Sequence, residues 1–239
     1  MSHDPYAFMS PATAGNGVVL RTPMDRRHAA AGATFAERDG WRIAEYEGEP
    51  ADPWLADVSH LGKLDVRGSQ AELDELTGGL PTGAARRDGD VWTLRLTPVH
   101  GYVLCPYGRV GALRDSIAET ARLNSAQSLT AVKSDDLTLS AIDVTSALAG
   151  VALGGSRWRD VMNRSSGLDV RPSRFGPGRC MAGSVMRVPT LIVNEGESIA
   201  MFVGWEYGEY FWDAIIDAGE TLGIGPRTPV QAAVSEAVA

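Results

Sequence analysis

The chain has 239 residues, a net charge of −8, 44% apolar residues and 22% charged residues. Such values are typical of a globular protein that buries most of its extended surface, and they exclude a disordered or fibrous chain. The acidic balance also argues against nucleic acid as a partner, because binding to a phosphate backbone requires clustered Lys and Arg.

The sequence indicates a cytoplasmic protein that does not enter a membrane. Cys105 and Cys180 are too few for a disulfide framework in a chain of this length, so we expect a reducing compartment. The first residues have neither the basic nor the apolar stretch of a secretory signal. No run of about 18 uncharged apolar residues predicts a membrane-spanning helix.

Three regions follow from the distribution of Pro, Gly and small polar residues. Residues 1–20 are predicted to form a flexible leader, and residues 226–239 a C-terminal tail. Residues 21–225 carry the periodic apolar patterns and are predicted to form a single folded domain.

The first elements are marked by capping signals. Thr22 and Pro23 predict the start of a short helix that ends near Ala31. Alternating large and polar residues over 41–46 predict a half-buried strand, and two more strands are expected around Val58 and over 64–66. Ser69 predicts the N-cap of a helix that ends at Gly78-Gly79.

The middle of the chain predicts a hairpin and a long helix. Asp88-Gly89 lies between two alternating segments that cover 84–96, a strong hairpin signal. A strand over 102–105 follows. Apolar residues at helical spacing (Val110, Leu113 and Ile117) then predict a core-facing helix.

The second half is predicted to begin with strands over 129–132 and 137–142. A helical region over 146–163 follows, broken at Gly154-Gly155, and then a loop over 165–180. The last elements are a bent strand over 186–193 that Pro189 keeps at a sheet edge or bulge, a strand over 199–205, and a helix that ends at Gly219.

Paired strands followed by helices predict an α+β fold with antiparallel sheets and helices packed on them. The order of strand pair and helix recurs near 58–77 and 137–163. This repetition predicts two weakly related halves.

Few residues carry a chemical pattern. The four histidines are scattered along the chain, so no metal site is predicted. Asp57-Val58-Ser59-His60 places a carboxylate, a hydroxyl and an imidazole at a strand end, where Asp57 or His60 could face a ligand. Alternatively, Asp57 and Ser59 satisfy backbone groups of a strand-end turn.

Several blocks resemble the glycine-cleavage T-protein, a folate-binding aminomethyltransferase. They are residues 22–41, from Thr22-Pro23 to Gly40-Trp41, and residues 56–68, which contain Asp57-Val58-Ser59-His60. The loop over 165–180 and Phe211-Trp212-Asp213-Ala214 are similar to segments of the gamma subunit of heterotetrameric sarcosine oxidase. Together these blocks cover about residues 21–225.

The resemblance implies a T-protein-like folate-binding domain, and it implies partners. Larger oxidase subunits would complete a heterotetramer and carry FAD, FMN and NAD, and tetrahydrofolate would accept the one-carbon unit taken from an N-methyl amino acid such as sarcosine. No cofactor is assigned to this chain alone, although tetrahydrofolate is considered as its ligand.

Departures from the T-protein motifs predict a non-catalytic or auxiliary subunit. The strand that carries an acidic pair in T-proteins reads Asp88-Gly89-Asp90 here, and the folate-clamping motif is reduced to Glu195-Gly196-Glu197. The remaining catalytic candidates are Asp57, His60 and Asp90; the ligand-binding candidates are Glu197, Asp57 and Trp41. The alternative is a free-standing enzyme or binding protein that uses tetrahydrofolate or another small molecule, so whether the chain is an enzyme stays open.

The loop over 165–180 carries exposed arginines. Arg171, Arg174 and Arg179 are predicted to contact the carboxylates of a partner or of a polyglutamate tail, or else to be solvated. Pro172 and Pro177 stiffen the segment and favour an ordered surface.

Overall fold

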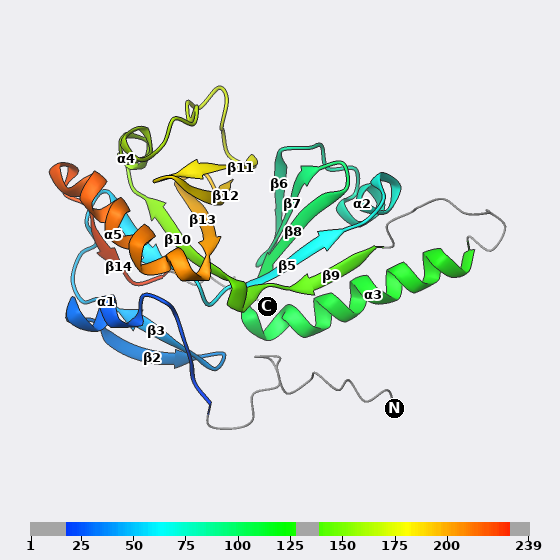
Figure 1. The fold of residues 1–239 in the computed structure, drawn as a ribbon, viewed down its shortest axis with the longest axis horizontal. Helices are drawn as coiled ribbons and strands as arrows, with labels where there is room; N and C mark the ends of the chain where they lie inside the picture. Colours follow the sequence, from blue (N-terminus) through cyan, green and yellow to red (C-terminus); the bar gives the residue numbers. More distant parts are fainter. Residues whose placement is uncertain (1–17, 128–138, 230–239) are drawn as a thin grey trace, which may run out of the picture.

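The computed structural model describes residues 18–127 and 139–229. The strand expected over 129–132, most of the leader and most of the tail lie outside these ranges. Within them the chain forms three β-sheets and five α-helices, shown in Figure 1. The α+β fold predicted from the sequence is confirmed.

A small sheet carries the start of the described chain. Its order is β1-β3-β2, and its strands are β1 (Leu20–Arg21), β2 (Thr34–Arg38) and β3 (Trp41–Glu45). Helix α1 (Asp25–Ala30) lies between β1 and β2 in the chain.

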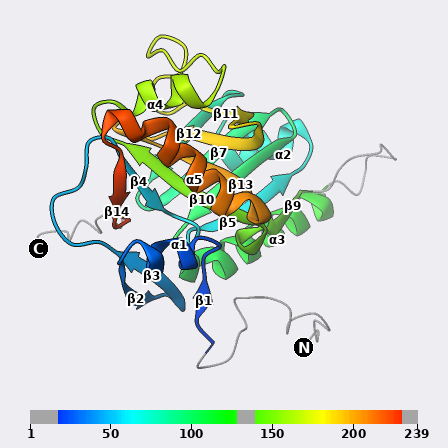
Figure 2. The same ribbon diagram turned by 60° about the vertical axis from the view of Figure 1, so that its left-hand side comes forward.

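The six-stranded sheet has the order β11-β12-β13-β10-β4-β14. Its strands are β4 (Trp54–Asp57), β10 (Leu148–Gly154), β11 (Cys180–Val185), β12 (Val188–Asn194), β13 (Ser198–Gly204) and β14 (Gly225–Arg227). Helices α4 (Trp158–Ser165) and α5 (Gly208–Gly219) cover one of its faces (Figures 1 and 2).

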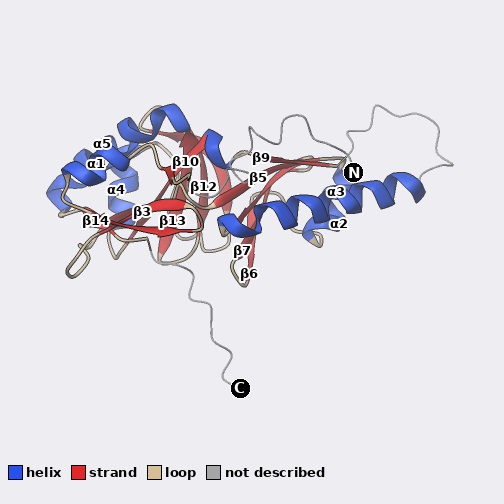
Figure 3. Ribbon diagram, turned by 90° about the horizontal axis from the view of Figure 1, so that it is seen from below, coloured by secondary structure: helices blue, strands red, loops and turns tan. Residues whose placement is uncertain are grey.

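The five-stranded sheet has the order β6-β7-β8-β5-β9. Its strands are β5 (Gly62–Arg67), β6 (Ala84–Asp88), β7 (Val91–Thr97), β8 (His100–Cys105) and β9 (Ser140–Asp143). Helices α2 (Gln70–Thr77) and α3 (Val110–Gln127) lie beside it, as Figure 3 shows from below.

Pairing is antiparallel throughout these sheets except for two short parallel pairs, β1 with β3 and β14 with β4. Three apolar clusters hold the layers together. One packs α4 and α5 on the six-stranded sheet, one joins the two large sheets around Leu94 and Phe202, and one packs α3 on the five-stranded sheet around Leu64.

Local signals located several elements correctly. Ser69 accepts a hydrogen bond from the backbone of Glu72, which forms a capping box, and Gly78 ends α2 in the left-handed conformation. The predicted hairpin is β6–β7, in which Asp88 pairs with Val91 and the turn is at Gly89-Asp90, one residue later than expected. Among the described residues no helix is both long and apolar enough to cross a bilayer.

The prediction of a helix over 146–163 is wrong for the first half of this range. Residues Leu148–Gly154 form β10, which pairs with β13 on one side and β4 on the other. A strand buried on both faces has a continuous apolar run and no alternation, so its periodicity resembles that of a buried helix. Only α4 in the second half is helical.

Two further details differ from expectation. Met186 and Arg187 have φ values of 49° and 66° and form the turn between β11 and β12, so 186–193 is not one strand. Strand β12 lies between β11 and β13 and is no edge strand, and Pro189 pairs with Ser184 before the pairing with β13 begins at Leu191. Thr22 does not cap α1, whose N-cap is Met24.

Close strand packing at Gly101 gives a first prediction. A Cβ atom at this residue of β8 would lie 2.4 Å from the carbonyl oxygen of Leu94 on β7. We expect Gly101→Ala to lower the free energy of unfolding by about 1–3 kcal/mol, because backbone must move. Urea unfolding measures the change.

Gly111→Ala in α3 is the matched control. Nothing lies within 4 Å of a Cβ at this position. The change should stabilise the protein by about 0.5–1 kcal/mol, because Gly is a poor helix former. Equal effects of the two substitutions would contradict the packing argument.

Candidate functional site

The candidate site is a buried group of polar residues where the three sheets meet. We call it the polar junction: His28 on α1, Tyr46 after β3, Asp57 at the end of β4, Ser59 in the following turn, and Lys63 on β5. The chain leaves the six-stranded sheet after Asp57 and enters the five-stranded sheet at Gly62. Asp57 was predicted from the sequence as a site residue, whereas His28, Tyr46 and Lys63 were not.

Asp57 uses both of its carboxylate oxygens inside the protein. Oδ2 accepts a hydrogen bond from His28 Nε2 at 3.0 Å, and Oδ1 accepts one from the backbone N–H of Ser59 at 2.9 Å. The side chain of Thr22 hydrogen-bonds to the same carboxylate. Ser59 and Asp57 therefore form the strand-end turn that was the alternative interpretation of this segment.

His28 continues the network to Tyr46. Its Nδ1 lies 2.7 Å from the Tyr46 hydroxyl, and the edge of its ring meets Trp212 of α5 at a centroid distance of 4.7 Å. A neutral imidazole that donates from Nε2 to Asp57 accepts the Tyr46 proton at Nδ1. One aromatic ring thereby connects α1, the end of β3, the end of β4, and α5.

The electrostatics of this network favour a fixed carboxylate. Burial acts to raise the pKa of Asp57, but hydrogen bonding to His28 and the charge of that ring, together with Thr22 and Ser59, hold the pKa below its ordinary value. Burial and the charge of Asp57 raise the pKa of Tyr46 to about 12. Asp57 is thus an ionised acceptor and Tyr46 a protonated donor at neutral pH.

Lys63 is enclosed completely, with 0% exposure. Its Nζ donates to the carbonyl oxygens of Ser59 and Leu61, both at 2.8 Å, and of Thr145 at 3.4 Å. Burial lowers the pKa of this amine to about 7 although the charges of Asp57 and Asp143 act to raise it. The amine joins the turn after β4 to the segment before β10 and has no solvent access as a nucleophile.

His60 and Trp41 lie at the margin of the polar junction. Burial lowers the pKa of His60 to about 4, so its ring is neutral at physiological pH. Trp41 is 1% exposed and packs edge-on against Tyr107 at a centroid distance of 5.6 Å. Within the described part of the chain, His60 Nδ1, Trp41 Nε1 and the Tyr107 hydroxyl are buried and have no hydrogen-bond partner.

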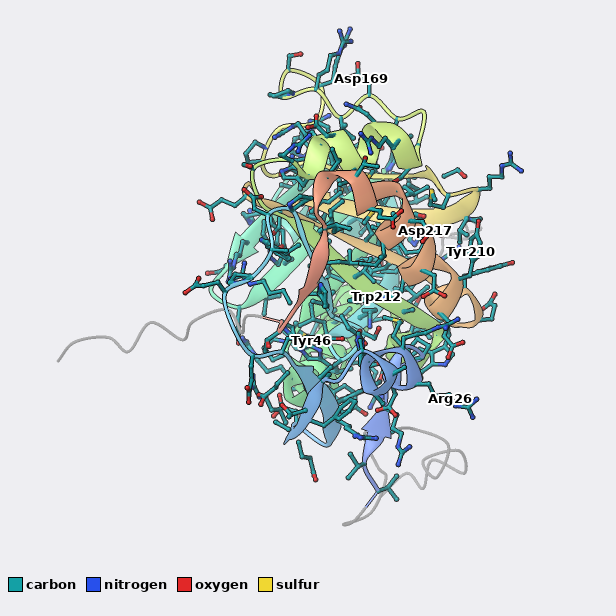
Figure 4. The ribbon with its side chains drawn as sticks, turned by 90° about the vertical axis from the view of Figure 1, so that its left-hand side faces the viewer. Arg26, Tyr46, Asp169, Tyr210, Trp212 and Asp217 are labelled. Carbon is teal, nitrogen blue, oxygen red and sulfur yellow. The ribbon has the colours of Figure 1, made fainter. Side chains whose placement is uncertain are left out.

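The other candidates lie elsewhere. Asp90 is in the turn between β6 and β7 and forms an ion pair with Arg109, and Glu197 is exposed in the turn between β12 and β13. The structure therefore does not gather Asp57, Asp90 and Glu197 around one ligand. Figure 4 shows Tyr46 and Trp212 far from the loop that carries Asp169.

Two surface hollows contain glutamates that were not predicted as site residues, Glu37 in one and Glu47 and Glu49 in the other. One of about 250 Å³ is lined by Tyr46, Glu47, Arg227 and Thr228, among others. A second, of about 480 Å³, lies on the small sheet beside Phe35 and Arg42. Neither contains Asp57, Asp90 or Glu197. No group of three potential metal ligands occurs in the described ranges.

Sequence signals for the missed residues are weak. His28 is a single histidine on a six-residue helix, and its partner Asp57 is 29 residues away in the sequence. Lys63 is one of two lysines and interrupts an otherwise buried strand. That interruption is a usable signal, because a lysine inside a buried strand must find acceptors.

Comparisons with known proteins agree with the resemblance seen in the sequence. Residues 117–221 match the model of the sarcosine oxidase, gamma subunit family. The chain is 27% identical to an aminomethyltransferase of Streptomyces coelicolor, over 86% of this chain and 59% of that protein. It is 26% identical to sarcosine oxidase subunit alpha of Corynebacterium sp. strain P-1, over 94% of this chain and 27% of that subunit.

Solved structures show the same fold. Aminomethyltransferase T of the glycine cleavage system from Bartonella henselae matches with a TM-score of 0.64 and 15% identity, over 88% of this chain and 60% of that one. A chain of heterotetrameric sarcosine oxidase from Corynebacterium sp. U-96 matches with a TM-score of 0.60 and 22% identity, over 84% and 95%. The resemblance to the T-protein superfamily and to the sarcosine oxidase gamma subunit is confirmed.

Removal of the charge of Asp57 tests its structural role. We expect Asp57→Asn to lower the free energy of unfolding by about 3 kcal/mol or more, because the amide does not replace the buried carboxylate as the charged hydrogen-bond acceptor of His28. In the control Asp213→Asn, whose surface ion pair with Arg27 is 44–49% exposed, the loss should stay below about 1 kcal/mol. Chemical denaturation measures both, and a neutral Asp57→Asn would refute the role.

Lys63 should make stability depend on pH. Between pH 7 and 10.5 the unfolded chain keeps this amine protonated while the folded protein holds it neutral, because burial lowers its pKa to about 7. The unfolded state then binds more protons, so the free energy of unfolding rises with pH over this window. Below about pH 7 the contribution is constant.

Comparison with Lys63→Met isolates the effect. The unfolding free energy of the wild type minus that of the variant should increase from pH 7 to 9.5 by an amount on the order of 2 kcal/mol or more. The exposed substitution Arg114→Met should leave the pH dependence unchanged. A flat difference for Lys63→Met would show that the amine titrates normally in the folded protein.

Proposed function

We propose that this chain is a non-catalytic, gamma-type subunit of a flavin-dependent oxidase of sarcosine or a related N-methyl amino acid. In this complex the one-carbon unit passes to tetrahydrofolate, and larger subunits carry FAD, FMN and NAD. The match to the sarcosine oxidase gamma subunit family and the shared fold support this assignment. The single folded domain over 21–225 is part of the same proposal.

The burial and hydrogen bonding of Asp57 are the main support for a non-catalytic role. Both of its oxygens are already bonded within the chain, and its partner His28 is 2% exposed. General acid–base catalysis requires a group within hydrogen-bond reach of the substrate, and Asp57 is only 5% exposed. Asp90 is neutralised by Arg109, and Glu197 stands alone on a turn.

The two acidic residues predicted to bind tetrahydrofolate, Asp57 and Glu197, do not face a hollow in the described part of the chain. The N–H edge of a pterin ring requires a carboxylate that faces a cavity. Among the described residues the buried candidate Asp57 is saturated, and the exposed candidate Glu197 lines neither hollow. We therefore assign no step of folate chemistry to this chain and place it on the larger subunits.

Co-expression with the larger sarcosine-oxidase-type subunits of the same organism tests the proposal. We expect a stoichiometric complex with flavin absorbance and sarcosine-dependent reduction of oxygen, and no such activity from this chain alone. Activity of the isolated chain with an aminomethyl donor and tetrahydrofolate would refute the non-catalytic role. Failure of the subunits to associate would refute the subunit assignment.

Substitutions inside that complex separate structural from catalytic carboxylates. Asp90→Asn and Glu197→Gln should leave the turnover of sarcosine within about twofold of the wild type, since one side chain pairs with Arg109 and the other is exposed. A loss of about a hundredfold or more in either variant would assign that residue to the reaction.

A free-standing ligand-binding protein is the second candidate. The buried and unpartnered Trp41 Nε1, Tyr107 hydroxyl and His60 Nδ1 favour it, because buried polar groups are normally satisfied by protein, water or ligand. Titration of the isolated chain with tetrahydrofolate distinguishes the two candidates. Binding that Glu197→Gln abolishes would support the second one.

A further inference from the structure

The charge of this protein is distributed very unevenly. Residues 156–187 contain seven arginines and two aspartates, a net charge of +5 in a chain whose total is −8. The rest of the chain therefore carries −13. We call residues 156–187 the basic cap; it comprises α4, the loop over 166–179, β11 and the turn at Met186-Arg187.

The parts of the basic cap form one continuous structure. The backbone N–H of Met186 donates to the carbonyl oxygen of Ser165 at the end of α4 at 2.7 Å. Arg159 Nε on α4 donates to the carbonyl oxygen of Val170 at 3.1 Å. Figures 1 and 2 show α4 and this loop together at one end of the molecule.

The arginines of the basic cap are less neutralised than those elsewhere. Arg174, Arg179 and Arg187 are exposed, and their side chains form no hydrogen bond or ion pair with any other described residue. Arg164 is exposed and bonds only to neutral groups, the Ala218 carbonyl and the Thr221 hydroxyl. In contrast, many arginines outside the cap pair with carboxylates: Arg27, Arg38, Arg42, Arg67, Arg95, Arg109 and Arg122.

The loop that presents Arg174 and Arg179 is anchored to the core and to neighbouring strands. Phe175 is 1% exposed in the core under α4 and α5, and its carbonyl oxygen accepts a hydrogen bond from Asn194 Nδ2 at 2.7 Å. The backbone of Gly178 donates to Asn194 and accepts from Ala85. An ordered surface loses little conformational entropy on binding, so little binding free energy is spent on ordering its charged side chains.

The edge of the basic cap also offers aromatic surface. Tyr210 of α5 is 53% exposed and donates from its hydroxyl to the carbonyl oxygen of Met186, next to Arg187. Tyr207, one turn earlier, is 43% exposed. Tyr and Arg are enriched in protein–protein interfaces, where they supply most of the binding energy.

We propose that the basic cap is a docking surface for an acidic face of another protein, namely a larger subunit of the proposed oxidase complex. This inference rests on the proposed function. Guanidinium groups bind carboxylates through two parallel hydrogen bonds, and Arg171 already does so with Asp169 at 2.8 and 2.5 Å. The −13 carried by the remaining chain disfavours an extended polyanion such as nucleic acid, which would lie across acidic surface as well.

A charge-reversal variant of the full chain tests the docking surface. Arg174→Glu, Arg179→Glu and Arg187→Glu are combined, and the affinity for the co-purified larger subunits is measured by biolayer interferometry. We expect binding weaker by about tenfold or more at about 0.1 M salt, and a smaller salt dependence than in the wild type, because like charges now face each other.

The matched control changes the same charge at another place. Arg26→Glu, Arg114→Glu and Arg122→Glu lie on α1 and α3, and Figure 4 shows Arg26 at the opposite end of the molecule from Asp169. This variant should bind within about threefold of the wild type. Unfolding curves verify that both variants fold. If the reversal variant does not fold, the neutral set Arg174→Gln, Arg179→Gln and Arg187→Gln replaces it.

The outcomes separate the two proposals. If the wild type assembles and the basic-cap variant assembles equally well, the docking surface is refuted and the subunit assignment stands. If binding by both variants weakens equally, only the total charge matters and the docking surface is refuted as well.

If the wild type does not assemble, the subunit assignment fails, and the inference built on it fails too. Tight, salt-dependent binding of a DNA duplex to the cap in place of the subunits would also overturn it.

Discussion

The buried pair of Asp57 and His28 is the interaction on which the arrangement of the sheets depends. His28 comes from α1 beside the small sheet, and Asp57 ends β4 of the six-stranded sheet. Lys63 is the second residue of β5 in the five-stranded sheet, and its amine bonds to the turn that follows Asp57. Leaving a buried carboxylate without its hydrogen-bond partner costs about 1–3 kcal/mol or more, a large share of the stability of a domain. The bonds at this point therefore specify how three sheets join, and the apolar clusters fill the space between them.

The same bonds explain why a scaffold shared with aminomethyltransferases need not be an enzyme. An Asp–His–Tyr chain resembles the networks that activate nucleophiles, since each group orients the next. Here the carboxylate is saturated, the phenol holds its proton, and the amine of Lys63 points at three carbonyl oxygens. Asp57 and Lys63 are buried and hydrogen-bonded in this network, whereas Tyr46 also lines a surface hollow.

Charged side chains on the surface are arranged differently from those in the interior. In the polar junction Asp57 and Lys63 are hydrogen-bonded within the chain, whereas in the basic cap Arg174 and Arg179 on the loop and Arg187 in the later turn are exposed. The net charge of the protein is −8, yet positive charges are concentrated at one end. Their mutual repulsion must be offset by the groups that surround them there. The hydrogen bonds of the polar junction join the sheets, and the exposed charge of the basic cap is the basis of the proposed docking surface.

Local chemistry by itself determined the capping box at Ser69, the hairpin at Asp88-Gly89, the apolar stripe of α3 and the α+β class, because each depends on residues a few positions apart. The family resemblance also lay in short blocks of sequence.

Only the tertiary structure decided that Leu148–Gly154 is a central strand, that Asp57 meets His28, and that Asp90 and Glu197 lie apart. These outcomes depend on contacts between residues far apart in the chain, and neither a continuous apolar run nor an isolated histidine specifies its partner.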